Sequence, residues 1–208
     1  YIQEKYLLNS TFIPYGYNHT QRVDLSKNIT NNYSFLKKKY AFKVCRIEPE
    51  NNISMILDVF SQINQILVIV GNWKNSNYAI KTKKKYQKFK NIYLLDPIFD
   101  QYKLDLIRSN CHLYIHGHSA GGTNPSLVEA MGLGLAIIAF KSKFNISTTK
   151  SSCLFFKNKK ELKEILTSLN ENELKEISRN VYVVAKNEYN WDKIANSYID
   201  LINKSSIR

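Results

Sequence analysis

The chain has 208 residues, enough for one sizeable domain, and its 44% hydrophobic and 23% charged residues are typical of a folded globular protein. This composition excludes a disordered chain. The sequence has no run of about 18 apolar residues that could span a membrane, and its three cysteines are too few for a disulfide scaffold. The 30 Lys and Arg residues against 17 Asp and Glu give a net charge of +13, which favours anionic partners such as nucleotides, nucleic acids or acidic lipid headgroups.

Short apolar runs alternate with stretches of helical period along the chain. Residues 1–8 are expected to end a helix that begins upstream. The predicted strands are Thr11–Ile13, Ala41–Ile47, Ile66–Val70, Ile92–Leu95, His112–Ile115, Leu135–Phe140 and Cys153–Phe156. The predicted helices are Ile53–Gln62, Asn77–Phe89, Phe99–Ser109, Pro125–Gly132, Lys159–Leu169, Glu171–Glu188 and Trp191–Asn203. This alternation predicts an α/β fold, a Rossmann-like doubly wound parallel sheet flanked by helices.

Glycine and proline mark one edge of this predicted sheet. Three of the four prolines follow predicted strands directly, and five of the seven glycines lie between Gly117 and Gly134. Turns need these residues in any fold, but open parallel sheets also bind ligands at the carboxyl ends of their strands. The three cysteines, Cys45, Cys111 and Cys153, have no metal-ligand spacing and are expected to be small buried hydrophobic residues.

The segment from His116 to Met131 joins a predicted strand to a predicted helix. Gly121 and Gly122 allow close approach of the backbone to a ligand, and Asn124 with Pro125 forms a typical helix start. A helix N-terminus attracts phosphate. The spacing fits neither a Walker loop nor a dinucleotide fingerprint, so the segment predicts anion binding. Glu129 could accept hydrogen bonds from two sugar hydroxyls, or it could compensate the helix dipole.

The same segment resembles the donor-binding signature of group 1 (family 4) glycosyltransferases, which is Glu, seven residues, Glu, then Ala-Met-x-x-Gly. Further segments resemble family elements in the same order along about 190 residues. These are Phe12-Ile13-Pro14-Tyr15-Gly16, Cys45-Arg46-Ile47-Glu48-Pro49-Glu50-Asn51-Asn52 and Asn190-Trp191-Asp192. The sequence from Gly121 to Met131 is similar to that of the rhamnosyltransferase-type branch of this family.

The resemblance implies the nucleotide-sugar-binding half of a GT-B enzyme, which works without a bound metal or other cofactor. It assigns Arg46 to the donor diphosphate as the catalytic residue and Glu129 to the ribose. Gly122, Thr123 and Asn124 match the helix start that faces the phosphates. Donor contacts are also expected from the base-reading loop with Pro97 and Ile98, and from His118, although a turn histidine is an equal alternative there.

Two departures from the family pattern affect the predicted donor site. The first glutamate of the pair is Gly121 here, so recognition of the sugar must be arranged differently. The lysine that accompanies the arginine is Asn51, which can bond a phosphate but brings no charge.

We therefore expect residues 1–188 to form the donor-binding domain and residues 189–208 a C-terminal helix packed on it or crossing from it. The acceptor domain is expected upstream of this sequence. The implied activity is hexosyl or deoxyhexosyl transfer, with retention, from a nucleoside diphosphate sugar to a glycan or lipid-linked acceptor. The alternative is a stand-alone nucleotide- or nucleic-acid-binding module without catalysis.

Lysines cluster on one face of the predicted helix Asn77–Phe89 and in residues 37–39. A solvated amphipathic helix and a charged loop explain this pattern, and so does contact with anionic headgroups. The latter would place the protein in the cytoplasm at the inner face of the membrane. No nucleic-acid partner is expected, because the sequence has no helix-turn-helix, zinc-finger or RNP-type motif.

Overall fold

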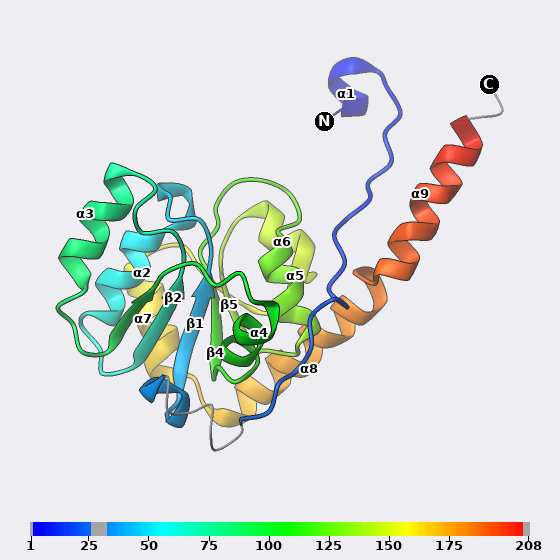
Figure 1. Ribbon diagram of the computed structural model, residues 1–208. Coiled ribbons are helices and arrows are strands. Elements are labelled where there is room, and N and C mark those ends of the chain that lie inside the picture. Colours follow the sequence, from blue (N-terminus) through cyan, green and yellow to red (C-terminus); the bar gives the residue numbers. More distant parts are fainter. Residues whose placement is uncertain (1, 26–32, 206–208) are drawn as a thin grey trace.

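The computed structural model describes residues 2–25 and 33–205, and its centre is a six-stranded sheet in the order β3-β2-β1-β4-β5-β6 (Figure 1). All neighbouring strands are parallel. The strands are β1 (Tyr40–Val44), β2 (Ile66–Val70), β3 (Ile92–Leu95), β4 (Leu113–His116), β5 (Ile137–Phe140) and β6 (Leu154–Phe156). The predicted Rossmann-like doubly wound fold is confirmed.

Helices cover both faces of the sheet. The helices of the described chain are α1 (Ile2–Tyr6), η2 (Ser34–Lys37), η3 (Pro49–Asn51), α2 (Ile53–Phe60), α3 (Asn77–Tyr86), α4 (Gln101–Ser109), α5 (Pro125–Gly132), α6 (Lys143–Thr149), α7 (Lys159–Ser168), α8 (Glu171–Glu188) and α9 (Trp191–Ser205). Figure 1 shows α2, α3 and α7 on one side of the sheet and α4, α5, α6 and α8 on the other. The helix α7 crosses back after β6 to pack on α2, whereas α8 packs on α5 and α6.

The core lies between the sheet and these two helical layers. The β2 run from Leu67 to Val70 is buried throughout, as expected for a strand covered on both faces. Rings of Phe42 and Tyr114 pack in the neighbouring strands β1 and β4 at a centroid distance of 6.2 Å. One charged residue, Lys43, is also buried within β1. Because burying a charge is costly without a function or a partner, Lys43 is considered with the site below.

Most predicted elements are confirmed, with two exceptions. The segment Thr11–Ile13 is not a strand, because it lies largely exposed and pairs with no strand of the sheet in the described chain. The helix α6 was not predicted, since its seven residues are rich in polar and β-branched types with low helix propensity; the Ser142 side chain accepts a hydrogen bond from the Asn145 amide at its start.

Helix ends follow their capping residues. The helix α4 begins at Gln101 rather than Phe99, because the Asp100 carboxylate accepts a hydrogen bond from the Lys103 amide. The expected helix at the beginning of the chain is present as α1. Among the cysteines, Cys153 is buried, whereas Cys45 and Cys111 are partly buried and pack against the core.

The last helix, α9, projects away from the sheet and its helical layers (Figure 1). Its first turn is anchored on the domain: Ile194 is buried, and the Trp191 ring lies against Gly16. No helix in residues 2–25 and 33–205 is long and apolar enough to cross a membrane.

Candidate functional site

The candidate site lies where β1 and β4 are neighbours in the sheet although they are far apart in sequence. From β1 the chain proceeds through β2 and β3 toward one edge of the sheet, and from β4 it proceeds through β5 and β6 toward the other. The loops after β1 and β4 therefore diverge and leave a crevice at the carboxyl ends of the strands. Such topological switch points are the usual ligand sites of open parallel sheets.

Side-chain amides join these two loops to each other. The Asn51 Nδ2 donates to the Arg46 carbonyl at 3.0 Å, and the Asn51 Oδ1 lies 2.8 Å from Nδ1 of His118. Next to it, Asn52 Nδ2 donates to the Gly117 carbonyl at 2.8 Å. Asn51 is thus buried with both ends of its amide engaged, and it holds Arg46 and His118 in place from below the loop surface.

The close packing of the loops depends on Gly117. A β-carbon at Gly117 would lie 2.3 Å from the Asn51 carbonyl oxygen, which is shorter than any normal contact. Ser119 adds a second connection, because its backbone amide and its hydroxyl each donate to the Glu50 carbonyl at 2.9 Å. The loop after β4 is therefore fixed to the loop after β1 at several points.

Arg46 is the exposed cation of this site. Its side chain is 76% exposed, and its one ion pair in the described chain is a long contact of 3.7 Å from Nη2 to Glu50 Oε1. An exposed pair at this distance adds little stability, so the guanidinium can turn to a ligand at small cost.

The start of α5 has the expected geometry. The Asn124 side chain accepts from the Ser126 amide at 3.1 Å, and Pro125 occupies the first turn. Before it, Gly121 adopts a left-handed φ of 103°, and a β-carbon at Gly122 would meet no atom within 4 Å. The Gly121-Gly122 backbone is therefore open to an approaching ligand.

A groove of about 270 Å³ lies beside this helix start, and the sequence predicted only Gly122 and Thr123 among the residues that line it. Gly122 and Thr123 form one wall, and Lys143 and Phe144 from α6 contribute to the other, with Phe12 from the N-terminal segment. The only signal in the sequence is Ser142 after a strand, which indicates a helix start like that of α5. Lys143 brings an exposed cation next to the predicted phosphate loop.

Glu129, the predicted ribose ligand, belongs to a network that the sequence did not reveal. Arg108 is fully buried and pairs with both Asp105, at 2.6 Å, and Glu129. On the other side, the Trp191 indole donates to His19 Nδ1 at 3.0 Å, which leaves the proton of His19 on Nε2, 2.9 Å from Glu129 Oε1. Glu129 is still 17% exposed, and a carboxylate has about four acceptor positions.

A buried polar cluster underlies the crevice. Burial lowers the pKa of Lys43, and burial together with the charge of Lys43 lowers the pKa of both His116 and His118. In the described part of the chain, neither ring nitrogen of His116 has a hydrogen-bond partner, although the residue is buried. Both histidines are therefore neutral near pH 7.

The predicted base-reading loop leaves β3, the strand at the sheet edge. This loop connects the carboxyl end of β3 to α4, which lies on the opposite face of the sheet and leads to β4. It therefore has to pass over the carboxyl edge of the sheet. Pro97 is partly buried and Ile98 packs against the core, while Phe99 is 94% exposed.

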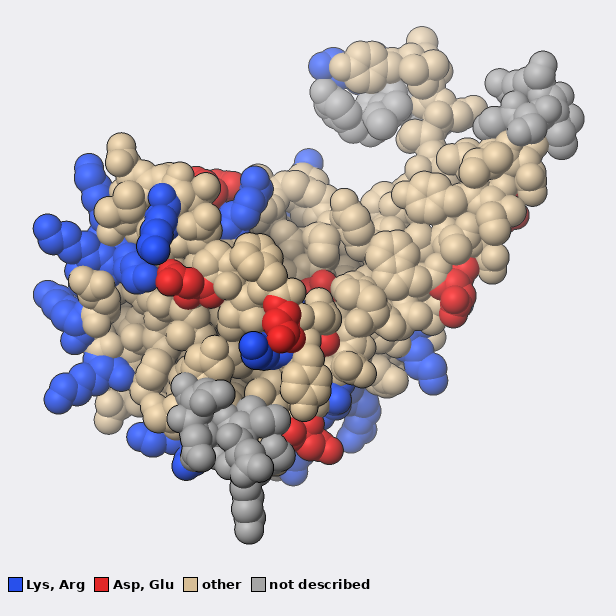
Figure 2. Space-filling view, viewed as in Figure 1, with Lys and Arg blue, Asp and Glu red and all other residues tan. Residues whose placement is uncertain are grey.

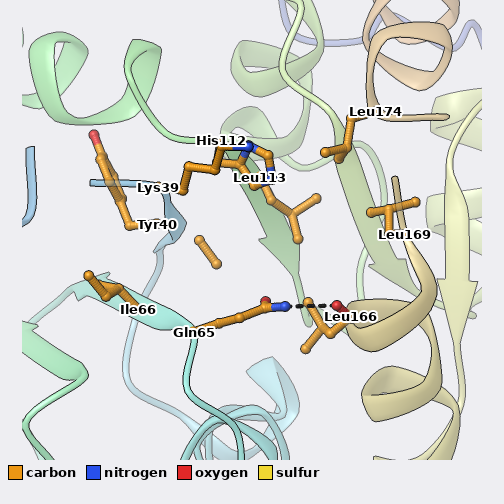
Figure 3. Close-up of a pocket in the computed structure, with 10 residues that line it drawn as sticks. Lys39, Tyr40, Gln65, Ile66, His112, Leu113, Leu166, Leu169 and Leu174 are labelled. Carbon is orange, nitrogen blue, oxygen red and sulfur yellow. Dashed lines mark hydrogen bonds between the residues drawn. The ribbon is translucent and has the colours of Figure 1, made fainter. Parts of the chain in front are cut away.

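A different pocket, of about 150 Å³, lies at the amino ends of the strands, opposite the crevice (Figure 3). Figure 3 shows Tyr40, Ile66 and Leu113 from the amino ends of three strands together with Leu166, whose carbonyl accepts from Gln65 Nε2 at 2.8 Å. It contains none of the predicted site residues, and it lies away from the crevice where parallel sheets bind ligands.

The fold and the position of these loops define the class of the protein, a Rossmann-like domain like those of GT-B glycosyltransferases. The model of the family described as glycosyl transferases group 1 matches residues 26–191. The chain therefore belongs to this family. A comparison with curated protein sequences finds no match.

Solved structures support the fold. Sucrose-phosphate synthase from Thermosynechococcus elongatus is similar with a TM-score of 0.76 and 14% identity, over 94% of this chain and 52% of that one. HepE from Anabaena, in complex with UDP-glucose, has a TM-score of 0.77 and 15% identity over 92% of this chain and 56% of its own. The C-terminal domain of LpcC, a group 1 family protein from Francisella tularensis, has a TM-score of 0.64 and 15% identity over 79% of this chain and 94% of its own. The present chain thus spans about half the length of the first two proteins.

Proposed function

We propose that this chain is the donor-binding half of a glycosyltransferase that takes its sugar from a nucleoside diphosphate. The observation that carries this proposal is the crevice between β1 and β4, where the exposed Arg46 and the open start of α5 belong to loops that are bonded to each other. A guanidinium and a helix N-terminus are both suited to a diphosphate and to the charge that grows on it as the sugar leaves. The UDP-glucose complex of HepE supports a nucleotide-sugar donor.

Most of the predicted contacts have a direct role in this proposal. Arg46 binds the diphosphate, Gly122 and Thr123 present backbone amides to it, and Glu129 holds the ribose with the acceptor positions that Arg108 and His19 leave open. Pro97 and Ile98 contact the base. Asn51 acts as a positioning residue, because both ends of its amide are already bonded.

The charge that the family lysine would bring comes, in this proposal, from Lys143. This lysine lines the groove next to Gly122 and Thr123, whereas Asn51 in the place of the family lysine is uncharged and buried. The leaving diphosphate is then stabilised by two side-chain cations and a helix dipole, without a resident metal or cofactor.

For the intact protein, we propose transfer of a hexosyl or deoxyhexosyl group, with retention, to a glycan or a lipid-linked acceptor at the inner face of the cytoplasmic membrane. The acceptor would bind to a second domain, toward which residues 189–208 extend, and a rhamnosyltransferase-type specificity is the finer proposal. We expect little or no transfer by this chain alone, because the proposed acceptor domain supplies the other wall of the cleft.

Calorimetric titration with UDP, dTDP and GDP tests the donor site. We expect saturable binding of at least one of them, and Arg46→Ala should weaken that binding by about 1.5–3 kcal/mol, the cost of a lost charged hydrogen bond. Lys90→Gln, a change of one exposed lysine just before β3 at the amino edge of the sheet, serves as the control and should leave the affinity unchanged. Absence of saturable binding to all three nucleotides would refute the proposal, whereas equal affinities of Arg46→Ala and the parent would remove only Arg46 from the site.

A further inference from the structure

Two rows of lysines that are far apart in sequence meet on one face of the molecule. The first exposed row is Lys81 and Lys84 on α3 with Lys88 in the turn that follows it. On α7, it is Lys159, Lys160 and Lys163. We call these six residues the lysine face. Both helices belong to the layer of α2, α3 and α7, on the side of the molecule where Figure 2 shows many blue side chains projecting.

Asp58 on α2 joins the two rows. Its Oδ1 pairs with Lys85 of α3 at 3.2 Å, and its Oδ2 pairs with Lys159 of α7. The pKa of the Asp58 carboxyl is lowered by its bonds to Lys159, Tyr86 and Lys85, which outweigh the effect of burial. Asp58 is therefore ionised and neutralises part of the charge between the helices, so that they can pack with their remaining lysines directed outward.

The lysines of the α3 row have no partner that would neutralise them. Lys81, Lys84 and Lys88 form no ion pair with any described residue. On α7, Lys160 has only a contact of 3.9 Å to Glu164, and Lys163 reaches only an uncharged amide, that of Gln62 at 3.5 Å. Apart from Lys159, which pairs with Asp58, the lysines of this face carry a concentrated positive charge that the fold itself does not use.

We propose that the lysine face docks the protein on an anionic phospholipid membrane, an inference that specifies the peripheral contact proposed above. All its cations are lysines, and α2, α3 and α7 contain no arginine, the residue favoured for forked contacts to bases and phosphates. None of these three helices exposes an aromatic ring in its described residues, so bases have no surface on which to stack. Ile80, 51% exposed beside Lys84, gives the face an apolar side chain that can enter the headgroup region.

This orientation suits the proposed reaction. The helices α2 and α3 both begin at the carboxyl edge of the sheet, where the crevice opens. If the membrane surface lies against the lysine face, the crevice stays open beside it. The crevice is then close to the lipid surface, where a lipid-linked acceptor would be found.

Vesicle sedimentation with the 208-residue chain tests the proposal. The chain should bind vesicles of equal parts phosphatidylglycerol and phosphatidylcholine, and should not bind pure phosphatidylcholine. The triple variant Lys81→Gln, Lys84→Gln, Lys88→Gln should lower the partition coefficient by about a hundredfold, since each lysine near an anionic surface contributes about fivefold. High salt should release the bound chain, because it screens surface charge.

The matched control removes the same charge from the opposite layer. Lys175→Gln, Arg179→Gln, Lys186→Gln changes three exposed cations of α8, and it should alter partitioning by less than about fivefold. Equal losses in the two triple variants would overturn the docking face, and so would tighter binding to duplex DNA than to the anionic vesicles at the same salt. Nucleotide affinity, measured separately on both variants, should stay unchanged, so failure of the docking face and failure of the donor site are distinguishable.

Discussion

At the scale of single residues, the site combines an exposed cation with buried groups that set its surroundings. Arg46 can turn to a ligand, whereas Glu129 is fixed by Arg108 on one side and by His19 on the other. Removing the charge of Glu129 would leave Arg108 as a buried cation with only Asp105, so a loss of nucleotide binding in such a variant would not separate a structural role from a ligand contact. Arg46 is therefore the cleaner probe of the site.

We expect His116 to make the stability of the domain depend on pH. Burial, with Lys43 and His118 nearby, holds its pKa well below the usual value near 6.5. The unfolded chain therefore takes up a proton near pH 6.5 while the folded chain does not, so stability is complete above this pH and falls as the pH decreases below it. The expected loss is about 1.4 kcal/mol per pH unit for this residue.

Urea unfolding of His116→Leu and the parent chain between about pH 5 and 8 measures this contribution. The variant should lose about 1.4 kcal/mol per pH unit of the parent's slope below pH 6.5, while His112 and His118, whose pKa values burial also lowers, keep the remaining slope. Parallel profiles for the two proteins would show that His116 is not a source of the acid sensitivity.

At the scale of elements, the two glycines of the loop after β4 have separable functions. Gly117 faces the Asn51 carbonyl, so Gly117→Ala should force the two loops apart and destabilise the fold by about 1–3 kcal/mol. Gly122 has free space for a β-carbon, so Gly122→Ala should change stability by less than about 0.5 kcal/mol. It should still weaken nucleotide binding, because the added methyl group stands where the ligand would approach the backbone.

Thermal unfolding and calorimetry on the two alanine variants give the stability and the affinity of each. The site geometry proposed here requires Gly122→Ala to fold as the parent does and to bind more weakly. A fully active nucleotide site in this variant would mean that the ligand does not contact the Gly121-Gly122 backbone.

The sequence predicted the elements well where local pattern determines them. The uninterrupted apolar run of β2 and the cap and proline of α5 are properties of neighbouring residues. The contacts around the site are different in kind, since Asn51 and His118 are 67 residues apart and His19 and Glu129 are 110 residues apart. No pattern among neighbouring residues indicates such contacts, so they cannot be predicted from a single sequence. The family resemblance indicated Arg46 and Glu129 but not their partners, and Lys143 remained hidden because α6 has no strong helix pattern.

At the scale of the whole molecule, α9 is divided into an anchored start and a projecting remainder. The start is held by Trp191, whose amide donates to Asn18 Oδ1 at 2.8 Å, and by the buried Ile194. Farther along, Tyr198 and Ile199 are 51% and 53% exposed, which is unusual for neighbouring large apolar side chains in a polar helix. We expect this part of α9 to contact the second domain rather than to stabilise the domain described here.

Truncation separates these two roles. Removing residues 197–208 keeps the anchored turn with Trp191 and Ile194, so it should lower the melting temperature much less than a truncation that removes this turn, and it should leave nucleotide affinity unchanged. Removing residues 190–208 also takes away Trp191 and the buried Ile194 and should cost about 2–5 kcal/mol, the usual loss for a buried isoleucine. In a protein that carries the proposed acceptor domain, the shorter truncation should reduce transfer although donor binding persists, because the exposed half of α9 would no longer join the domains. Unchanged transfer by that truncated protein would show that the projecting part of α9 does not form the domain contact.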